Sequence, residues 1–277
     1  MLKKYKDHVE ERLQQGIPPL PLNAEQVADL VELLKSPPAG EEEFILDLIK
    51  NRTPAGVDPA AYVKAAFLTA LAKGETSSPL IDKKLATELL GTMLGGYNVE
   101  SLIKLLKDEE VGAIAADGLS KTLLMFNAKH EVIELAAENE NAKRVVESWS
   151  NGEWFTSKSK LPEVIKAIVF RVDGEINTDD FSPAQDAPSR PDIPLHALAM
   201  LKKNMEDPIG TIEKLKESGL PVVFVGDVVG TGSSRKSATN SLLWHIGEDI
   251  PFIPNKRQAG ICTVSYTHLR AHETPAN

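Results

Sequence analysis

The chain has 277 residues, 42% of them hydrophobic and 26% charged, which is ordinary for a soluble globular protein with room for about two domains. The formal net charge of −9 argues against nucleic-acid binding driven by phosphate neutralisation over the whole surface. The single cysteine, Cys262, excludes an internal disulfide framework. No apolar run approaches the ~20 residues of a membrane span, and the charged N-terminus lacks a signal-peptide core, so we expect a cytoplasmic protein.

The first part of the chain, up to about residue 155, has the pattern of successive short helices. Asn23 and Gln26 have the spacing of a capping box, so we expect a helix to begin there. Its apolar residues recur at helical spacing: Val27, Leu30, Val31 and Leu34.

Residues 37–38 are prolines that end this helix, and the acidic run 41–43 suits the positive end of the next one. That next helix has the apolar face Phe44, Ile45, Leu48 and Ile49.

Asp58 and Pro59 predict the start of a further helix, and Gly74 predicts its end. We expect its inward face to consist of Val63, Ala66, Phe67, Ala70 and Leu71. Residues 82–93 and 98–107 predict another pair of helices. Short helices joined by short turns with proline or glycine favour an α-solenoid of the HEAT type, with a plain helical bundle as the alternative.

The pattern changes after about residue 157. Residues 166–172 contain three β-branched side chains and predict a strand, and Asp173–Gly174 is a turn signal. The polar, proline-rich residues 176–192 predict a long loop of a kind that is often functional. Further along, we expect helices over 193–205 and 211–218, a strand over 221–229, and a last helix from about Ser234 to Leu243. Strands that alternate with helices predict an α/β layer domain.

The sequence GTGSSRKSATN, residues 230–240, follows the second strand and suits an anion. Its two glycines allow a ligand to approach the backbone, and a helix that begins here would offer free N–H groups. Arg235 adds a planar guanidinium that fits a carboxylate. The spacing is neither that of a Walker A loop nor that of a dinucleotide-binding loop, and no histidine follows at the spacing of a serine–histidine–aspartate triad. The alternative is a glycine turn with a serine helix cap and solvated cations.

Long stretches of the chain carry a resemblance to a known family. GDVVGTGSSRKSATNSLLW, with NTDDFSPAQDAPSRPDIPLHALAMLK before it, resembles the swivel domain of the aconitase B family of bacterial aconitate hydratases. PLNAEQVADLVELLKSPPAGEEEFILDLI and ELLGTMLGGYNVESLI resemble the HEAT-like domain of the same family. The resemblance implies an all-α HEAT-like solenoid over residues 1–157, followed by an α/β swivel domain of β/β/α type, incomplete, over residues 158–262.

The resemblance also implies roles for residues of two loops. Ser233 would be the catalytic base that removes a proton from citrate or isocitrate, with cis-aconitate as the intermediate. A bare serine is a poor base, so nearby cations and N–H groups must stabilise its alkoxide. Ser233, Ser234, Arg235 and Arg190 match substrate-binding positions, and a tricarboxylate requires several cationic partners.

Other polar residues of these segments have lesser expected roles. Asp179 and Asp180 lie in the matching NTDD segment and would position the arginines or their loop. His196 and His245 fall in apolar helix patterns, so we expect them in the core or at its boundary. His130 is expected on the surface of a helix.

The family works through a [4Fe–4S] cluster held by three cysteines, whose open iron acts as a Lewis acid on the departing hydroxyl. This chain has one cysteine, Cys262, and one thiolate cannot hold a cluster. We therefore expect the full-length family protein to bind the cluster and to be active, and we expect no hydratase activity from these 277 residues alone. Turnover by a purified, iron-reconstituted sample of the chain would contradict this expectation.

The residues after Cys262 depart from the family pattern. VSYTHLRAHET, residues 264–274, resembles one reading frame of a transposase adapter used in sequencing libraries, so we interpret residues 263–277 as a read-through artefact. His268 and His272 have the i,i+4 spacing of a metal pair, but this interpretation gives them no weight. The sequence leaves open whether the ending is biological.

Three functions compete. The N-terminal part of an aconitate hydratase is favoured, with dehydration of 2-methylisocitrate as a variant that uses the same carboxylates. The second is a cluster-free helical binding module, because the family is associated with homodimerisation through this domain and with mRNA binding; 19 basic against 25 acidic groups over residues 1–160 argue against RNA. The third is a stand-alone swivel subunit that docks on a separate catalytic polypeptide, and the fused helical domain argues against it.

Overall fold

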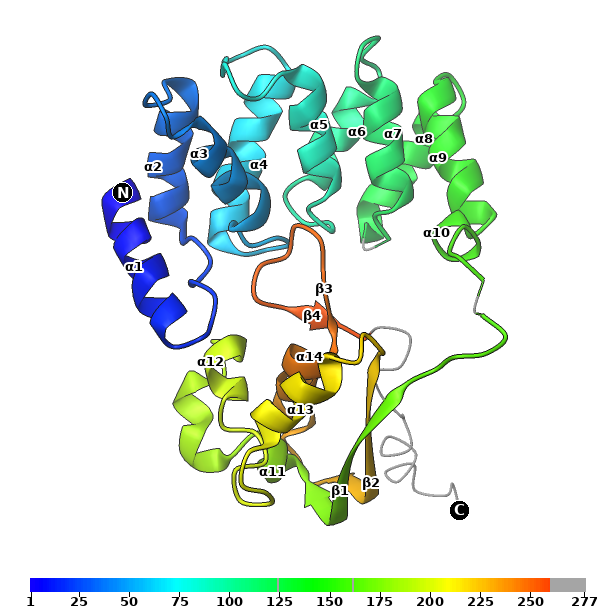
Figure 1. The fold of residues 1–277 in the computed structure, drawn as a ribbon. Coiled ribbons are helices and arrows are strands. Elements are labelled where there is room, and N and C mark those ends of the chain that lie inside the picture. Colours follow the sequence, from blue (N-terminus) through cyan, green and yellow to red (C-terminus); the bar gives the residue numbers. More distant parts are fainter. Residues whose placement is uncertain (124, 161, 260–277) are drawn as a thin grey trace. The chain divides into compact units, whose positions relative to one another are not determined.

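The computed structural model describes residues 1–123, 125–160 and 162–259. The chain divides into two units (Figure 1). The first consists of Met1–Tyr5, Pro21–Lys160 and Pro251–Pro254, and the second of Lys6–Leu20 and the remaining described residues. No helix in the described part of the chain is both long and apolar enough to cross a membrane.

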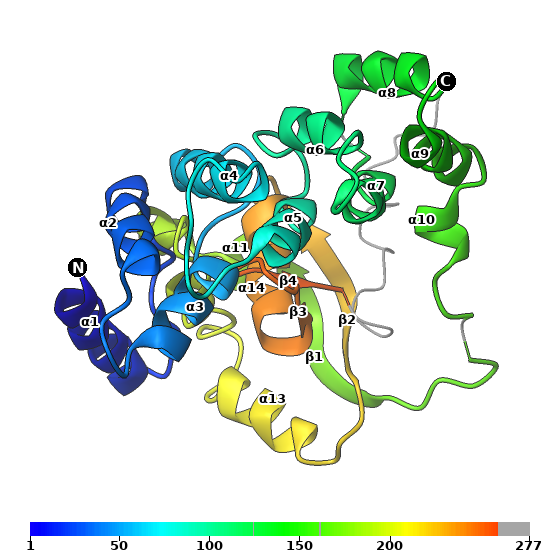
Figure 2. The same ribbon diagram turned by 90° about the horizontal axis from the view of Figure 1, so that it is seen from above.

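The first unit is a row of helices that follow one another in chain order (Figures 1 and 2). They are α2 (Ala24–Lys35), α3 (Glu42–Asn51), α4 (Pro59–Ala72), α5 (Lys83–Gly91), α6 (Val99–Leu105), α7 (Gly112–Ser120), the 3₁₀ turn η1 (Phe126–Ala128), α8 (Lys129–Leu135), α9 (Glu140–Ser150) and α10 (Glu153–Thr156). Helices α2, α4, α5, α7 and α9 pack successively against each other. Helices α3, α6 and α8 pack beside α2, α7 and α9. This layering confirms the prediction of a helical first region.

The predicted capping residues are present in this unit. The Asn23 side chain accepts a hydrogen bond from the Gln26 amide (2.9 Å), and the Gln26 side chain accepts one from the Asn23 amide (3.0 Å). Asp58 accepts a hydrogen bond from the Ala60 amide (2.8 Å) and caps α4. Gly74, just after the end of α4, has a φ of +73°.

The predicted inward face of α4 is partly wrong. Ala66 is exposed, and Lys64, which the periodicity placed outside the face, is buried. Helix α4 packs against α2 and also against α5, so its buried stripe is wider than one apolar row and begins earlier in the helix. The buried residues are Ala60, Ala61, Lys64, Ala65, Phe67, Leu68, Leu71 and Ala72.

Two glycines allow α5 and α7 to approach closely. A Cβ added at Gly118 would lie 2.8 Å from the Cα of Gly91, and one added at Gly91 would lie 3.1 Å from the Cα of Gly118. Side chains larger than hydrogen would force the two backbones apart at this crossing. The contact therefore depends on glycine at both positions.

The second unit is an α/β layer. Strand β1 (Ile168–Asn177) pairs in parallel with β2 (Val222–Thr231), with Phe170 opposite Phe224. The connection contains α11 (Thr178–Phe181), the 3₁₀ turn η2 (Ala184–Ser189), α12 (Ile193–Ala197) and α13 (Pro208–Lys216). After β2 come α14 (Arg235–Ile246) and a short antiparallel pair, β3 (Glu248–Asp249) and β4 (Arg257–Gln258). A parallel pair joined through helices confirms the α/β prediction.

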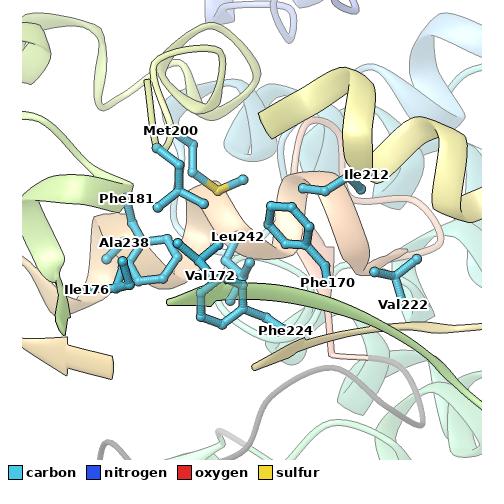
Figure 3. Close-up of a cluster of buried hydrophobic side chains, with 11 residues drawn as sticks. Phe170, Val172, Ile176, Phe181, Met200, Ile212, Val222, Phe224, Ala238 and Leu242 are labelled. Carbon is cyan, nitrogen blue, oxygen red and sulfur yellow. The ribbon is translucent and has the colours of Figure 1, made fainter. Parts of the chain in front are cut away.

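The core of this unit lies between the two strands and the helices on one of their faces (Figure 3). The rings of Phe170 and Phe181 both pack against Phe224, with centroids 5.8 and 5.2 Å apart. The buried cluster consists of Phe170, Val172, Ile176, Phe181, Met200, Leu201, Ile212, Val222, Phe224, Ala238 and Leu242. Alternate side chains of the strands, Val169, Val225 and Val228, are 40 to 51% exposed. Within the described residues, only one face of the strand pair is covered.

Two predicted boundaries in this unit are wrong. Asp173–Gly174 is not a turn but a bulge inside β1, because Gly174 takes a φ of +87° and its amide donates to Asp227 (2.8 Å) while the strand pairing continues. The helix predicted over 193–205 ends at Ala197. Leu201 has a φ of +59°, and its amide donates to the carbonyl of Asp180 (2.8 Å) instead of continuing the helix.

Candidate functional site

Two loops of the second unit carry the predicted site residues. The arginine loop, residues 182–192, lies between α11 and α12, and the serine loop, residues 230–235, joins β2 to α14. Arg190 lies in the first loop, and Ser233, Ser234 and Arg235 lie in the second. The structure brings Arg190 and Ser234 together.

A capping box precedes the arginine loop. The Asn177 side chain accepts hydrogen bonds from the amides of Asp179 (2.8 Å) and Asp180 (3.0 Å), and Asp180 in turn accepts one from the Asn177 amide (2.8 Å). The Asp180 carboxylate is therefore committed to its own helix, and Asp179 is exposed. Neither carboxylate pairs with an arginine in the described part of the chain. Their proposed positioning role remains a prediction.

Thr178, the first residue of α11, joins the two loop regions. It is 2% exposed, and its hydroxyl accepts a hydrogen bond from the Ser234 amide (3.2 Å). Gly232 has a φ of +107°, and a Cβ there would lie 2.5 Å from the Thr178 hydroxyl. Only glycine accommodates both this backbone conformation and this close approach. Sequence reasoning missed Thr178.

The serine loop ends at the N-terminus of α14. Ser234 is the N-cap residue, but its hydroxyl makes no capping hydrogen bond; it accepts one from Nη2 of Arg190 (3.4 Å). Ser233 and Arg235 are exposed, and Nε of Arg235 donates to the Gly232 carbonyl (3.3 Å) within the loop. The loop thus presents a serine and a guanidinium to solvent at the positive end of a helix dipole.

Arg190 is half-buried and is held by neutral groups. Nε donates to the Ser182 hydroxyl (3.2 Å), and Nη2 donates to the Ser182 carbonyl (3.3 Å) as well as to Ser234. Among the described residues, no acceptor is found for Nη1 and no carboxylate pairs with Arg190. Its positive charge and the N–H groups of Nη1 are therefore available to an anion.

Behind Arg190 lies a buried histidine. Nε2 of His196 is 2.8 Å from the Ser182 hydroxyl, and Nδ1 is 2.8 Å from the Ser189 hydroxyl and 3.1 Å from the Asp186 carbonyl. Burial lowers the pKa of His196, and the charge of Arg190 lowers it further. His196 is 2% exposed, which confirms its prediction as a core histidine.

His245 and His130 also lie where they were expected. His245 is 4% exposed, its Nε2 is 2.9 Å from the Ala197 carbonyl, and burial lowers its pKa. His130 is exposed on α8. Neither of them contacts Arg190 or the serine loop through any hydrogen bond found in the described residues.

A buried ion pair anchors the end of the arginine loop. Arg12, in α1 (Leu2–Gln14), donates from Nη1 and Nη2 to both carboxylate oxygens of Asp192 (2.7 and 2.8 Å), and its Nε donates to the Pro18 carbonyl (2.9 Å). The two side chains are only 6% and 15% exposed. Asp192 lies two residues after Arg190, and its charge is taken up by Arg12. No sequence signal singled out this pair, because its members lie 180 residues apart.

The side chains of the described residues do not fit an iron–sulfur cluster. The described residues contain no group of three or more histidine, cysteine, aspartate or glutamate side chains that could hold a metal ion. Cluster ligands are mainly cysteine thiolates, and the one cysteine of the chain, Cys262, lies outside the described residues. Residues 263–277, with His268 and His272, also lie outside them.

Two family models match the chain. Residues 4–155 match the "Aconitate B N-terminal domain", and residues 167–267 match the "Aconitate hydratase 2 N-terminus". The first model alone covers more than half of the chain.

Curated relatives agree with these models. The chain is 61% identical over 273 residues to aconitate hydratase B of Pseudomonas aeruginosa, covering 95% of the chain and 31% of the relative. For aconitate hydratase B of Escherichia coli the identity is 59% over 273 residues, covering 95% of the chain and 32% of the relative. For aconitate hydratase B of Helicobacter pylori the identity is 52% over 262 residues, covering 94% of the chain and 31% of the relative. The chain spans less than a third of the length of these relatives.

Proposed function

Because the chain belongs to the aconitate hydratase B family, we propose that it is the N-terminal part of an enzyme that interconverts citrate and isocitrate through cis-aconitate. Dehydration of 2-methylisocitrate is a related reaction that uses the same carboxylates. One observation carries the proposal: Arg190 contacts Ser234 across two loops (3.4 Å) and has no carboxylate partner among the described residues. An unneutralised arginine beside a serine loop suits a substrate carboxylate.

In this proposal the first region, residues 1–157, is a HEAT-like domain, and residues 158–262 are part of a swivel domain. The successive packing of α2, α4, α5, α7 and α9 supports a solenoid, since each of these helices contacts its neighbours in the row. The exposed valines on one face of β1 and β2 support an incomplete second domain.

The site residues have distinct roles. Arg190 and Ser234 bind one carboxylate of the substrate, and Arg235 binds another. Ser233 removes the proton from the carbon next to a carboxylate. Deprotonated serine is an unstable anion, so the charges of the two arginines and the N-terminal end of α14 lower the free energy of its alkoxide.

The [4Fe–4S] cluster of the full-length family protein would supply Lewis-acid chemistry. The described residues do not fit it, so we assign its ligands to the part of the longer protein that this chain does not include. In this proposal the described residues of the chain contribute carboxylate binding and proton removal.

A chimera tests this proposal. The chain replaces the matching residues of the Escherichia coli relative, and conversion of citrate to cis-aconitate is followed after cluster reconstitution. We expect Ser233→Ala to lower kcat by about 10²–10⁴-fold, the range of general acid–base catalysis, with little change in the Kd of the analogue tricarballylate. Ser237→Ala on α14 is the control and should be nearly silent. A Ser233→Ala chimera with near wild-type kcat would contradict the proposed base.

A further inference from the structure

We propose that His196 is a positioning residue of the carboxylate site and that it fixes the guanidinium of Arg190 through the hydroxyl of Ser182. The inference rests on the carboxylate-binding role proposed above for Arg190. It concerns a residue that does not itself touch the substrate, since His196 is 2% exposed and lies behind the arginine.

The partners of His196 define its tautomer. Nδ1 lies 3.1 Å from the Asp186 carbonyl, which can only accept a hydrogen bond. The Ser189 hydroxyl donates its one proton to the same carbonyl (2.7 Å), so this proton is not available to Nδ1. Nδ1 therefore carries the proton. In a neutral imidazole the other nitrogen, Nε2, is then an acceptor, so the Ser182 hydroxyl donates to it across 2.8 Å.

This arrangement determines what Ser182 can offer to Arg190. With its proton directed to His196, the Ser182 oxygen has lone pairs free to accept from Nε of Arg190 (3.2 Å). The carbonyl of the same residue accepts from Nη2 (3.3 Å). Ser182 is fully buried, so neither acceptor has water as an alternative partner. Arg190 is held at two points by one residue whose hydroxyl is oriented by His196.

The groups that hold Arg190 through hydrogen bonds also affect how it binds a ligand. A carboxylate in place of Ser182 would also orient Arg190, but it would neutralise the guanidinium and compete with a ligand. The groups that interact, namely the Asp186 carbonyl, the His196 imidazole and the Ser182 hydroxyl, are neutral, because burial and the charge of Arg190 lower the pKa of His196 more than the hydrogen bond and the charge of Asp186 raise it. The nearby carboxylate of Asp192 is occupied by Arg12. Arg190 is thus oriented without loss of its charge.

The test follows the Arg190 Nε–H signal by nitrogen-15 NMR in the 277-residue chain, with Arg190→Lys to assign it. We expect this proton to exchange slowly with water in the wild type. His196→Leu should accelerate the exchange at least tenfold or remove the signal. Ser182→Ala should have the same effect and tests the same link if His196→Leu fails to fold. His196→Gln, which keeps an acceptor, should restore part of the protection.

A matched control comes from the second buried histidine of the unit. His245→Leu removes a hydrogen bond to the Ala197 carbonyl and should leave the Arg190 signal unchanged. Long-range proton–nitrogen correlations in histidine-labelled protein should show His196 protonated on Nδ1. Wild-type exchange of the Arg190 Nε–H in both His196→Leu and Ser182→Ala, or a proton on Nε2 of neutral His196, would overturn the inference.

These measurements need no ligand, so the inference and the proposed function can fail separately. If tricarballylate does not bind although His196 holds Arg190 as described, only the proposed function is lost. If tricarballylate binds but the Arg190 signal does not depend on His196 or Ser182, only the positioning role is lost.

Discussion

The two units of the molecule bury positive charge in different ways. In the helical unit, Lys64 is 2% exposed, and its one hydrogen bond found in the described part of the chain is a long one to the Lys50 carbonyl (3.5 Å). In the α/β unit, Arg12 is paired with a carboxylate and Arg190 is held by neutral acceptors. Burial alone makes a charge expensive and shifts its pKa, whereas acceptors of the right kind keep it charged and oriented.

The largest expected effect comes from Arg12. Arg12→Met would leave the Asp192 carboxylate buried without its partner, and breaking such a pair costs about 3–5 kcal/mol of unfolding free energy. Urea denaturation measures this loss. The double variant Arg12→Met/Asp192→Leu removes both charges and should recover most of it. A single variant as stable as the wild type would show that the pair contributes nothing.

Removal of the Lys64 charge should have the opposite effect on the free energy of unfolding. Burial lowers its pKa from 10.5 to about 8, so the folded protein carries the full penalty below pH 8. Between about pH 8 and 10.5 the folded state loses this proton while the unfolded chain retains it, so the penalty fades and wild-type stability rises with pH.

Lys64→Met should therefore stabilise the protein by about 3 kcal/mol at pH 7, from ~1.4 kcal/mol per pKa unit, with little gain above pH 10.5. Urea denaturation at several pH values checks this. Lys84→Met, at an exposed position of α5, is the control and should change little at any pH. A destabilised Lys64→Met would mean that the lysine is better accommodated than its contacts indicate.

Two of the glycines with positive φ in the α/β unit, Gly219 and Gly232, give a smaller effect. Gly219 has a φ of +69° and open space around it, so Gly219→Ala should cost about 1 kcal/mol of backbone strain. Gly232→Ala adds the contact with the Thr178 hydroxyl and should cost about 1–3 kcal/mol, together with weaker tricarballylate binding. Thermal unfolding compares the two. If the two variants lose the same unfolding free energy, the close approach of Gly232 to Thr178 adds nothing to stability.

The smallest effects concern the two capping boxes. Asn23→Ala and Asn177→Ala should each lower the unfolding free energy by about 1 kcal/mol. Only Asn177→Ala should also weaken tricarballylate binding by the chimera, because its helix presents Thr178 to the serine loop. If both variants bind tricarballylate equally well, the capping of α11 has no role in ligand binding.

Much of the fold could be predicted because its signals are local. The Asn23–Gln26 spacing, the Asp58–Pro59 start and the β-branched strands act within a few residues of one another. The error at residues 193–205 has a tertiary cause, since the Leu201 amide bonds to the distant Asp180 carbonyl. Lys64 was missed because periodicity does not show that α4 has neighbours on two sides.

The site was less predictable. The sequence GTGSSR and the family resemblance pointed to the serine loop and to Arg190, but not to the contact between them, which joins residues 44 apart. The pattern Asn177-x-x-Asp180 has the spacing of a capping box and could have been found as Asn23 was. No sequence pattern indicates that Ser182 bonds to both His196 and Arg190. These contacts arise only when the chain folds and brings the three residues together.

The central claim is that two loops bind one carboxylate together, and calorimetric titration of the chimera with tricarballylate tests it most directly. Arg190→Ala and Arg235→Ala should each weaken binding by about 1.5–3 kcal/mol, the value of a charge-assisted contact, and the exposed Lys236→Ala should not. Arg190→Ala should also be strongly non-additive with Ser234→Ala, since the two side chains touch. Wild-type affinity in the Arg190→Ala chimera would contradict the account.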